Sequence, residues 1–216
     1  MKSKNASAPA SSKRSAAPAD ERRSGKYQRI LAAAIEVIAE HGFFQARVSE
    51  IARRAGVADG TIYLYFRNKE EVLLAAISNA FSAFLELAQA ELRSVRDPRE
   101  QLRRLALLHL TSLGSDRKLA TVFQTELRQS VRLLTQFSQH ELKQYFDLIR
   151  AVVREGQQAG AFRAELSDKI VANCFFGALD EMVTSWLLSD HEYSLARAAD
   201  AVVEVILRGV GSPDLR

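Results

Sequence analysis

The chain has 216 residues and a net charge of +4 at pH 7. A single cysteine, Cys174, excludes an intramolecular disulfide and suits a reducing compartment, and its apolar neighbours predict a small buried thiol. We expect neither a secretory signal nor an apolar segment near the roughly 18 residues that span a bilayer, which predicts a cytoplasmic protein without a membrane partner.

Basic charge is concentrated at the N-terminus. Residues 1–26 hold seven basic and two acidic side chains, a net charge of +5, so the remaining 190 residues sum to −1. Residues 1–24 are rich in Ser, Ala and Pro without periodicity, which predicts a disordered basic arm. Such an arm either neutralises nucleic-acid phosphates or keeps the chain soluble, and both interpretations stay open.

The first ordered segment is predicted to be a helix. It begins near Gly25, at the start of a domain over residues 25–74. Apolar residues recur at three- and four-residue spacing from Tyr27 to Ala39 and mark the buried face. Gly42 is expected to end this helix, because glycine is common just after a helix C-terminus.

Two short helices follow, over about 48–55 and 59–66. Gly56 supplies the turn between them because a residue without a Cβ tolerates positive φ, and Val57 fills the angle between the helices. Asp59 can cap the second helix. A helix, a short turn and a second helix are typical of the helix-turn-helix motif, whose second helix enters the major groove of DNA.

The second short helix carries hydroxyl groups. Ile62 and Phe66 are expected to anchor it in the core, while three side chains point outward: Thr61, Tyr63 and Tyr65. Hydroxyls in this position suit contacts to phosphates and base edges, and Lys69, at the next helix start, is placed to meet a phosphate. The alternative for the tyrosines is core packing, but two side chains two positions apart on a helix cannot both point inward.

Residues 27–74 resemble the DNA-binding domain of the TetR family of bacterial repressors. The matching segments are HGF at 41–43, IA at 51–52, AGV at 55–57, GTIYLYF at 60–66 and NKE at 68–70. The resemblance implies phosphate contacts by Thr61, Tyr63 and Lys69, and groove contacts by Ser49 and exposed residues from Gly60 to Tyr65. Where the family usually has a Thr pair this chain has Ala46 and Arg47, which leaves Arg47 available to the DNA backbone.

The rest of the chain predicts further helices and no strand, for an all-α fold of about nine helices. A long helix begins near Asn68, and Asp97 followed by Pro98 is typical of another helix start. Three more are predicted over 116–129, 132–158 and 168–188, the last after Ser167 as N-cap, and a final helix begins after Ser194. Residues 75–216 are thus predicted to form a helical ligand-binding and dimerisation domain beside the N-terminal three-helix domain.

A narrower resemblance links this half to the TetR-type regulators of fatty-acid degradation. It lies in TELRQS at 125–130, FGALDE at 176–181 and VTSW at 183–186, together with ADGTIYLYF at 58–66. It implies binding of long-chain acyl-coenzyme A as an effector, with release of operator DNA. The residues are compatible with such a ligand, because an acyl chain needs a long apolar tunnel and coenzyme A carries phosphates that arginines can hold.

Candidate ligand residues follow from that requirement. The apolar candidates are Phe81, Phe84, Leu105, Leu108, Phe123, Tyr145 and Phe146, and the phosphate candidates are Arg128 and Arg132, with Arg99 and Arg103 as alternatives. Core packing is the competing interpretation for each apolar side chain, and a solvated helix face for each arginine.

The helix over 168–188 is apolar nearly all round, more than one chain can cover. We therefore expect a two-fold homodimer in which two helices from each subunit form a four-helix bundle, as the family resemblance also implies. The candidate interface residues are Phe175, Ala178, Leu179, Met182, Trp186, Val202, Val203 and Ile206.

Competing function classes have little support. The sequence has no phosphate-cradling glycine loop, no nucleophile elbow and no Cys or His spacing for a metal, so we expect neither an enzyme nor a cofactor or metal site. A helical lipid or acyl carrier would not explain the segment over 48–69. A repressor of drug efflux that responds to an apolar or cationic compound remains the alternative within the same family.

Overall fold

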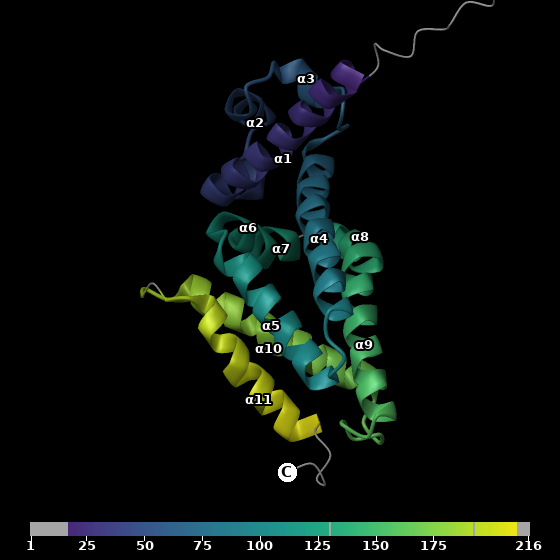
Figure 1. The fold of residues 1–216 in the computed structure, drawn as a ribbon. Coiled ribbons are helices and arrows are strands. Elements are labelled where there is room, and N and C mark those ends of the chain that lie inside the picture. The colour runs from purple at the N-terminus through teal and green to yellow at the C-terminus, as the bar shows by residue number, and fades with distance from the viewer. Residues whose placement is uncertain (1–16, 130, 192, 211–216) are drawn as a thin grey trace, which may run out of the picture.

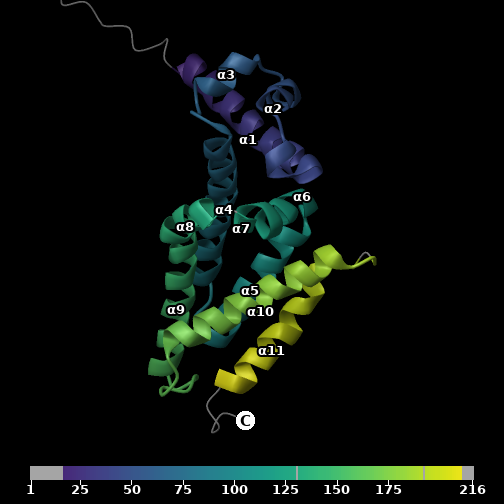
Figure 2. The same cartoon turned by 180° about the vertical axis from the view of Figure 1, so that it is seen from behind.

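The computed structural model describes residues 17–129, 131–191 and 193–210, and within these residues all regular structure is helical. Figure 1 shows three helices, α1 to α3, gathered at one end and joined by the long helix α4 to a larger helical body. Figure 2 shows the same arrangement from behind, with α10 and α11 crossing the end of the body far from α1 to α3. The predicted all-α fold is confirmed.

Helix α1 spans Ala17–Gln45, so it begins earlier than the expected Gly25. The prediction of disorder up to residue 24 is therefore wrong for residues 17–24, and residues 1–16 of the predicted arm lie outside the described residues. Gly42 has φ 75° and ψ 156°, a conformation that breaks the helix there, as predicted. One further helical turn, which ends at Gln45, lies between this break and α2.

The next helices are α2 (Val48–Ala55), α3 (Asp59–Tyr63) and α4 (Lys69–Arg93). The N-cap of α3 is Ala58, without a side-chain hydrogen bond, so the prediction that Asp59 caps this helix is wrong. Helix α3 also ends before the expected residue 66. The start of α4 is as expected, since the Asn68 side chain accepts a hydrogen bond from the Glu71 backbone N–H at 2.8 Å.

Helix α4 connects the two parts of the chain. By length and composition alone it is, among the described residues, the one helix that could cross a membrane, which corrects the expectation that no segment approaches that size. Seven of its side chains are buried inside this chain and line one face: Val72, Leu73, Ala76, Ile77, Phe81, Leu85 and Ala88. The composition is therefore that of a core helix.

The body is built from helices that pack on α4 or on one another. They are α5 (Pro98–Gly114), α6 (Arg117–Thr121), α7 (Leu127–Gln129), α8 (Val131–Phe137) and α9 (Lys143–Gln158). Two π-helical turns, Val122–Glu126 and Ser138–Leu142, join α6 to α7 and α8 to α9, so two predicted helices each contain a wide turn. Helix α5 starts as predicted, since the Asp97 side chain accepts from the Arg99 N–H at 3.1 Å.

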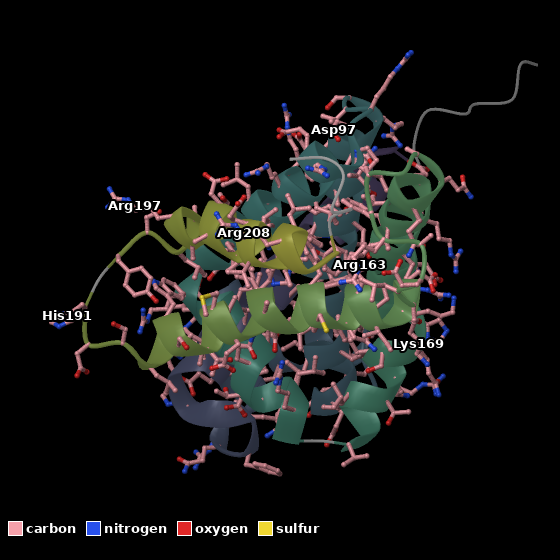
Figure 3. All side chains as sticks on the ribbon, turned by 90° about the horizontal axis from the view of Figure 1, so that it is seen from below. Asp97, Arg163, Lys169, His191, Arg197 and Arg208 are labelled. Atoms are coloured by element: carbon pink, nitrogen blue, oxygen red, sulfur yellow. The ribbon has the colours of Figure 1, made fainter. Side chains whose placement is uncertain are left out.

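The chain ends with α10 (Asp168–Leu188), a 3-10 turn over Leu195–Arg197 and α11 (Ala198–Val210). Ser167 and Ser194 occupy the predicted N-cap positions, although neither side chain makes a cap hydrogen bond. Figure 3 shows α10 and α11 side by side, with Arg163 at the end of α11. There the Arg163 backbone N–H donates to Val210 O at 2.8 Å and its guanidinium donates to Gly209 O at 3.2 Å.

Candidate DNA-binding surface and ligand cavity

The turn between α2 and α3 has the geometry of a helix-turn-helix. Gly56 adopts a left-handed conformation, with φ 66° and ψ 41°, and ends α2. The next residue, Val57, donates its backbone N–H to Ala52 O at 3.0 Å, which closes the turn. Ile62 and Phe66 are 1% and 3% exposed, and they fix α3 to the core as predicted.

Helix α3 presents a mixed surface to solvent. Tyr63 is 58% exposed, as predicted, and Leu64 beside it is 77% exposed, an apolar contact residue that sequence reasoning missed. Gly60 has an ordinary helical φ, and a Cβ added to it would meet nothing within 4 Å. The fold therefore does not need a glycine at this position, which leaves room for the backbone of α3 to approach another molecule closely.

Two predicted contact residues of α3 are less available. Thr61 is half-buried, and Tyr65 is half-buried with its ring 5.8 Å from the Tyr27 ring. The prediction that Tyr65 points outward is therefore wrong in part, because its ring packs on α1. On α2, Arg47 and Ser49 are exposed, and Arg47 is an N-cap without a side-chain cap bond, as the missing Thr pair suggested.

Lys69 has a different environment from the one predicted. Its Nζ donates to three backbone carbonyls, at 2.6 Å to Phe43 O, 3.2 Å to Phe44 O and 2.9 Å to Ala46 O. The ammonium also lies 4.6 Å from the centre of the Phe43 ring. All three N–H donors of the ammonium thus have acceptors in the segment after Gly42. We correct the assignment: Lys69 ties the start of α4 to the end of α1 rather than presenting a free charge to phosphate.

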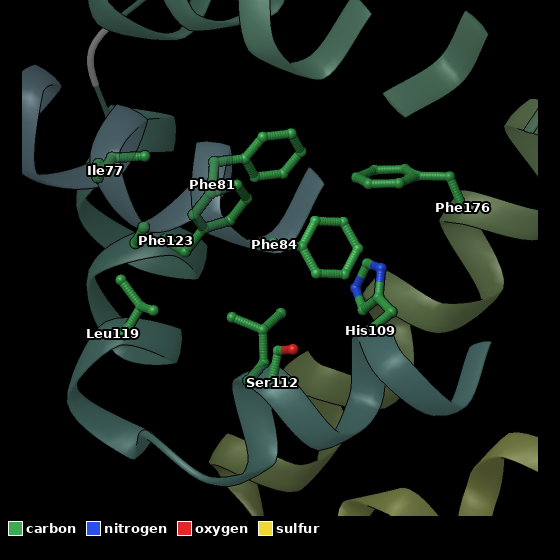
Figure 4. A pocket seen from close by; sticks show the side chains of 10 residues that line it. Ile77, Phe81, Phe84, His109, Ser112, Leu119, Phe123 and Phe176 are labelled. Carbon is green, nitrogen blue, oxygen red and sulfur yellow. The ribbon is translucent and has the colours of Figure 1, made fainter. Parts of the chain in front are cut away.

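A cavity of about 60 Å³ lies inside the body. It is lined by Ile77, Ala80, Phe81, Phe84, His109, Ser112, Leu113, Leu119, Phe123 and Phe176 (Figure 4). These residues come from α4, α5, α6, the first π turn and α10, so the cavity lies where these five elements meet. Nearly all of the lining is apolar, and the polar side chains in it are His109 and Ser112, one turn apart on α5.

Three of the predicted ligand residues, Phe81, Phe84 and Phe123, line this cavity. Their rings are in contact, with centroids 5.5 Å apart for Phe81 and Phe84 and 5.9 Å for Phe81 and Phe123. The other apolar candidates lie behind this lining: Leu105 is fully buried, Leu108 is half-buried, Tyr145 packs on Phe84 and Phe146 packs on Phe176. For these four, core packing is the better description.

Three of the four arginine candidates already have acidic or backbone partners. Arg128 forms an ion pair with Asp180 of α10, Arg103 lies 3.6 Å from Glu204, and the Arg99 guanidinium donates to Ala161 O at 3.3 Å. Arg132 lies in α8, but its side chain falls outside the described residues. Arg128 is therefore a neutralised charge beside α10, where a phosphate would have to compete with Asp180.

His109 is the ionisable side chain among the cavity residues that sequence reasoning missed. Its side chain is 6% exposed, and Nδ1 lies 3.3 Å from Tyr145 Oη. Burial lowers the pKa of His109 to about 4, against a smaller opposing effect of the Asp180 charge, so the imidazole is neutral at pH 7. Burial likewise raises the pKa of Tyr145 above its usual range. No local sequence pattern distinguishes this histidine from an ordinary surface or packing residue.

The two parts of the chain are joined by a polar contact. The Phe43 N–H, freed by the break at Gly42, donates to Glu126 Oε2 at 2.8 Å. Nearby, Glu40 accepts from Arg54 of α2 at 2.7 Å and from Lys118 of α6 at 3.2 Å, and these hydrogen bonds hold the pKa of Glu40 below its usual range. Glu126 ends the π turn that carries Phe123, so one short segment touches both the cavity and α1.

The predicted interface on α10 and α11 divides into two sets. Half of the predicted residues are buried within the single chain and cannot face a partner: Phe175, Leu179, Trp186 and Val203. The other half are half-buried: Ala178, Met182, Val202 and Ile206. Exposed apolar side chains missed by the prediction are Ile170, Leu188 and Val205, at 64%, 79% and 72%. Cys174 is also exposed, so the expected buried thiol is wrong for this chain alone.

Comparison with known proteins adds independent information. The model for the tetR family of bacterial regulatory proteins matches residues 30–76, and that for the C-terminal region of YsiA-like protein matches residues 77–209. The chain is 38% identical to the fatty acid metabolism regulator protein of Bacillus subtilis (strain 168), over 86% of this chain and 95% of that protein.

Two solved structures have the same fold. FadR from Bacillus subtilis in complex with stearoyl-CoA superimposes with a TM-score of 0.82 and 37% identity, over 85% of this chain and 98% of that chain. The fatty acid degradation regulator FadR from Bacillus halodurans gives 0.80 and 40%, over 84% of this chain and 94% of that chain.

Proposed function

The chain belongs to the tetR family of bacterial regulatory proteins, and we propose that it is a homodimeric repressor of fatty-acid metabolism genes that long-chain acyl-coenzyme A releases from operator DNA. The observation that supports the proposal is that one short segment contacts both the cavity and the helix α1 of the DNA-binding end. The π turn over Val122–Glu126 holds a cavity wall at Phe123 and a hydrogen bond to α1 at Glu126.

DNA binding is assigned to the exposed side of α2 and α3. Five residues form the proposed contact set: Arg47, Ser49, Gly60, Thr61 and Tyr63. Hydroxyl and guanidinium groups suit phosphates and base edges, and the open backbone at Gly60 allows α3 to enter a major groove. Tyr65 and Lys69 act from behind, by holding α3 and α4 against α1.

The test of DNA binding starts with sequences selected by the full-length protein from a pool of random duplexes. Tyr63→Ala is expected to weaken binding to the selected site by about 5- to 150-fold, because a good base contact is worth about 1–3 kcal/mol. Its fold should be unchanged, since the side chain is 58% exposed. Gln144→Ala, an exposed change on α9 outside the proposed DNA-binding surface, cavity and dimer face, is the control. Equal affinity of both variants would contradict the assignment.

The effector is assigned to the cavity. At about 60 Å³ it is well below the roughly 300–1,000 Å³ typical of ligand pockets, so a long ligand must push the aromatic lining apart. An acyl chain supplies about 0.8 kcal/mol for each methylene that it buries, which is the source of free energy for that displacement. FadR from Bacillus subtilis, which matches this chain over 98% of its own length, has a structure in complex with stearoyl-CoA.

Two elements connect the aromatic lining of the cavity to the DNA-binding end, so displacement of the lining can move the DNA-binding helices. Phe81 and Phe84 lie on α4, which begins beside α3, and Phe123 lies on the π turn that ends at Glu126. A dimer must hold its two recognition helices about 34–36 Å apart to meet successive major grooves. A ligand that favours a different spacing by about 1–3 kcal/mol would weaken operator binding 5- to 150-fold.

Effector specificity is tested by operator release across acyl lengths. Palmitoyl-coenzyme A should release the selected duplex, whereas free coenzyme A and acetyl-coenzyme A should not, because neither carries a chain that fills the cavity. Phe84→Trp should bind DNA normally and respond weakly, since the larger ring occupies the space of the chain. If acyl length has no effect on release, the effector assignment is wrong and the DNA-binding assignment stands.

The dimer is assigned to the face that α10 and α11 share. The half-buried residues Ala178, Met182, Val202 and Ile206 lie on the same two helices as two exposed apolar side chains, Ile170 and Val205. Burial of such a face in a second copy removes apolar surface from water. Val205→Arg should therefore shift the protein from dimer to monomer in analytical ultracentrifugation, and a fully dimeric variant would place the interface elsewhere.

A further inference from the structure

One residue of the cavity wall has a buried polar atom without a hydrogen-bond partner. Among the described residues, three buried side-chain atoms lack a hydrogen bond, and His109 Nε2 is the one that belongs to a residue of the cavity wall. Figure 4 shows the imidazole beside the Phe84 ring and below the Phe176 ring, and the centroids of these two rings are 6.0 Å and 5.9 Å from that of His109. A buried polar atom without a partner costs about 1–3 kcal/mol, so it requires an explanation.

The hydrogen-bond network indicates that Nε2 carries the proton. Within the described part of the chain, the hydroxyl of Tyr145 has His109 Nδ1, at 3.3 Å, as its hydrogen-bond partner. A tyrosine hydroxyl is a donor that needs an acceptor when buried. If it donates to Nδ1, the neutral imidazole must hold its own proton on Nε2. The cavity wall then presents one N–H donor that needs an oxygen acceptor.

Other polar side chains lie on the side of the cavity where His109 is found. Phe176, which packs on His109, lies one turn before Asp180 on α10. Asp180 accepts from Gln124 Nε2 at 2.8 Å and pairs with Arg128, whose side chain is 47% exposed. Gln124 Oε1 is itself a buried atom without a partner. A line of polar side chains thus leads from the surface at Arg128 toward His109, whereas the wall formed by Ile77, Phe81 and Leu119 is apolar.

We propose that His109 is a specificity-determining residue whose Nε2–H donates a hydrogen bond to the carbonyl oxygen of the thioester in a bound fatty-acyl thioester. The inference rests on the proposed function, because it assumes that an acyl thioester occupies the cavity. The acyl chain then lies against the apolar wall, and the polar carrier extends toward Asp180 and Arg128. His109 thereby marks the boundary between the two parts of the ligand.

The test removes the carbonyl from the ligand as well as the donor from the protein. Binding of palmitoyl-coenzyme A and of its thioether analogue S-hexadecyl-coenzyme A, which lacks the carbonyl, is measured by calorimetry. The wild-type protein should bind the thioether about tenfold more weakly, the effect of one buried hydrogen bond. His109→Leu, which has no donor, should bind the two ligands with equal affinity. His109→Asn, which restores an N–H donor, should recover part of the discrimination.

Ser112→Ala is the matched control, because Ser112 is the other polar residue of the cavity wall and lies on the same helix. It should keep the tenfold preference for the thioester. If the wild-type protein binds both ligands equally, or if His109→Leu keeps the preference, the proposal is overturned and the partner of Nε2 is not the thioester. If neither ligand binds the wild-type protein, the effector assignment itself fails, which is a separate result. The comparison of two ligands on wild-type protein remains informative even if a variant fails to fold.

Discussion

Replacement of Lys69 by methionine separates a structural role from a phosphate contact. The ammonium donates to Phe43 O at 2.6 Å, Ala46 O at 2.9 Å and Phe44 O at 3.2 Å, so the methionine side chain leaves all three carbonyls without this donor. It keeps a similar length and an apolar stem, so the change removes mainly the charge and the donors.

The expected loss follows from these contacts. A hydrogen bond to a charged group contributes about 1.5–3 kcal/mol, but Phe44 is 76% exposed and water can replace that bond. Lys69 is itself half-buried, so the remaining two bonds together are worth about 2–3 kcal/mol. For a chain of this size, that corresponds to a fall in melting temperature of about 5–10 °C.

Thermal unfolding followed by circular dichroism measures the loss of stability, and titration of duplex binding against salt measures phosphate contacts. Lys69→Met should melt earlier, with an unchanged slope of log affinity against log salt. Arg47→Met, at an exposed position on the DNA-binding surface, should melt normally and lower the slope by about one. A normal melting temperature with a lower slope for Lys69→Met would refute the structural role and restore the phosphate contact.

Three further predictions concern single positions. Gly60→Ala should raise stability by up to about 1 kcal/mol in denaturant unfolding and yet weaken operator binding in gel shifts, because a Cβ there meets nothing in the fold. Gly156→Ala should lower stability by about 1–3 kcal/mol, since its Cβ would lie 2.1 Å from the Phe162 ring. The pKa of His109 is lowered from 6.5 to about 4, so its contribution to stability is complete above pH 6.5 and is lost as the pH falls through 4. Relative to His109→Leu, the wild-type protein should therefore lose about 3 kcal/mol of unfolding free energy between pH 7 and pH 4, and parallel pH profiles would contradict the buried neutral imidazole.

Features that depend on neighbouring residues could be predicted from the sequence. The caps at Asn68 and Asp97 and the breaks at Gly42 and Gly56 involve groups within a few positions, so local patterns were sufficient. The predicted cap at Asp59 failed for a related reason: the helix begins one residue earlier than the pattern suggests, and the carboxylate falls inside it.

Features that depend on distant partners could not be predicted. The acceptors of Lys69 lie on the far side of a break in α1, and the partner of Arg128 is on α10. Periodicity identified aromatic faces but could not separate Phe81 and Phe84, which line the cavity, from Tyr145 and Phe146 behind them. His109 had no local signal, since its unpartnered nitrogen exists only where α4, α5 and α10 meet.

The central claim is that the cavity and the DNA-binding surface are coupled, and reciprocal linkage tests it most directly. Calorimetry gives the affinity of palmitoyl-coenzyme A for the protein alone and for the protein saturated with its selected duplex. Fluorescence anisotropy gives the affinity for that duplex with and without palmitoyl-coenzyme A. The account predicts that each ligand weakens the other by the same factor, between about 5- and 150-fold. Affinities that are unchanged in both directions would show that the two sites are independent and would contradict it.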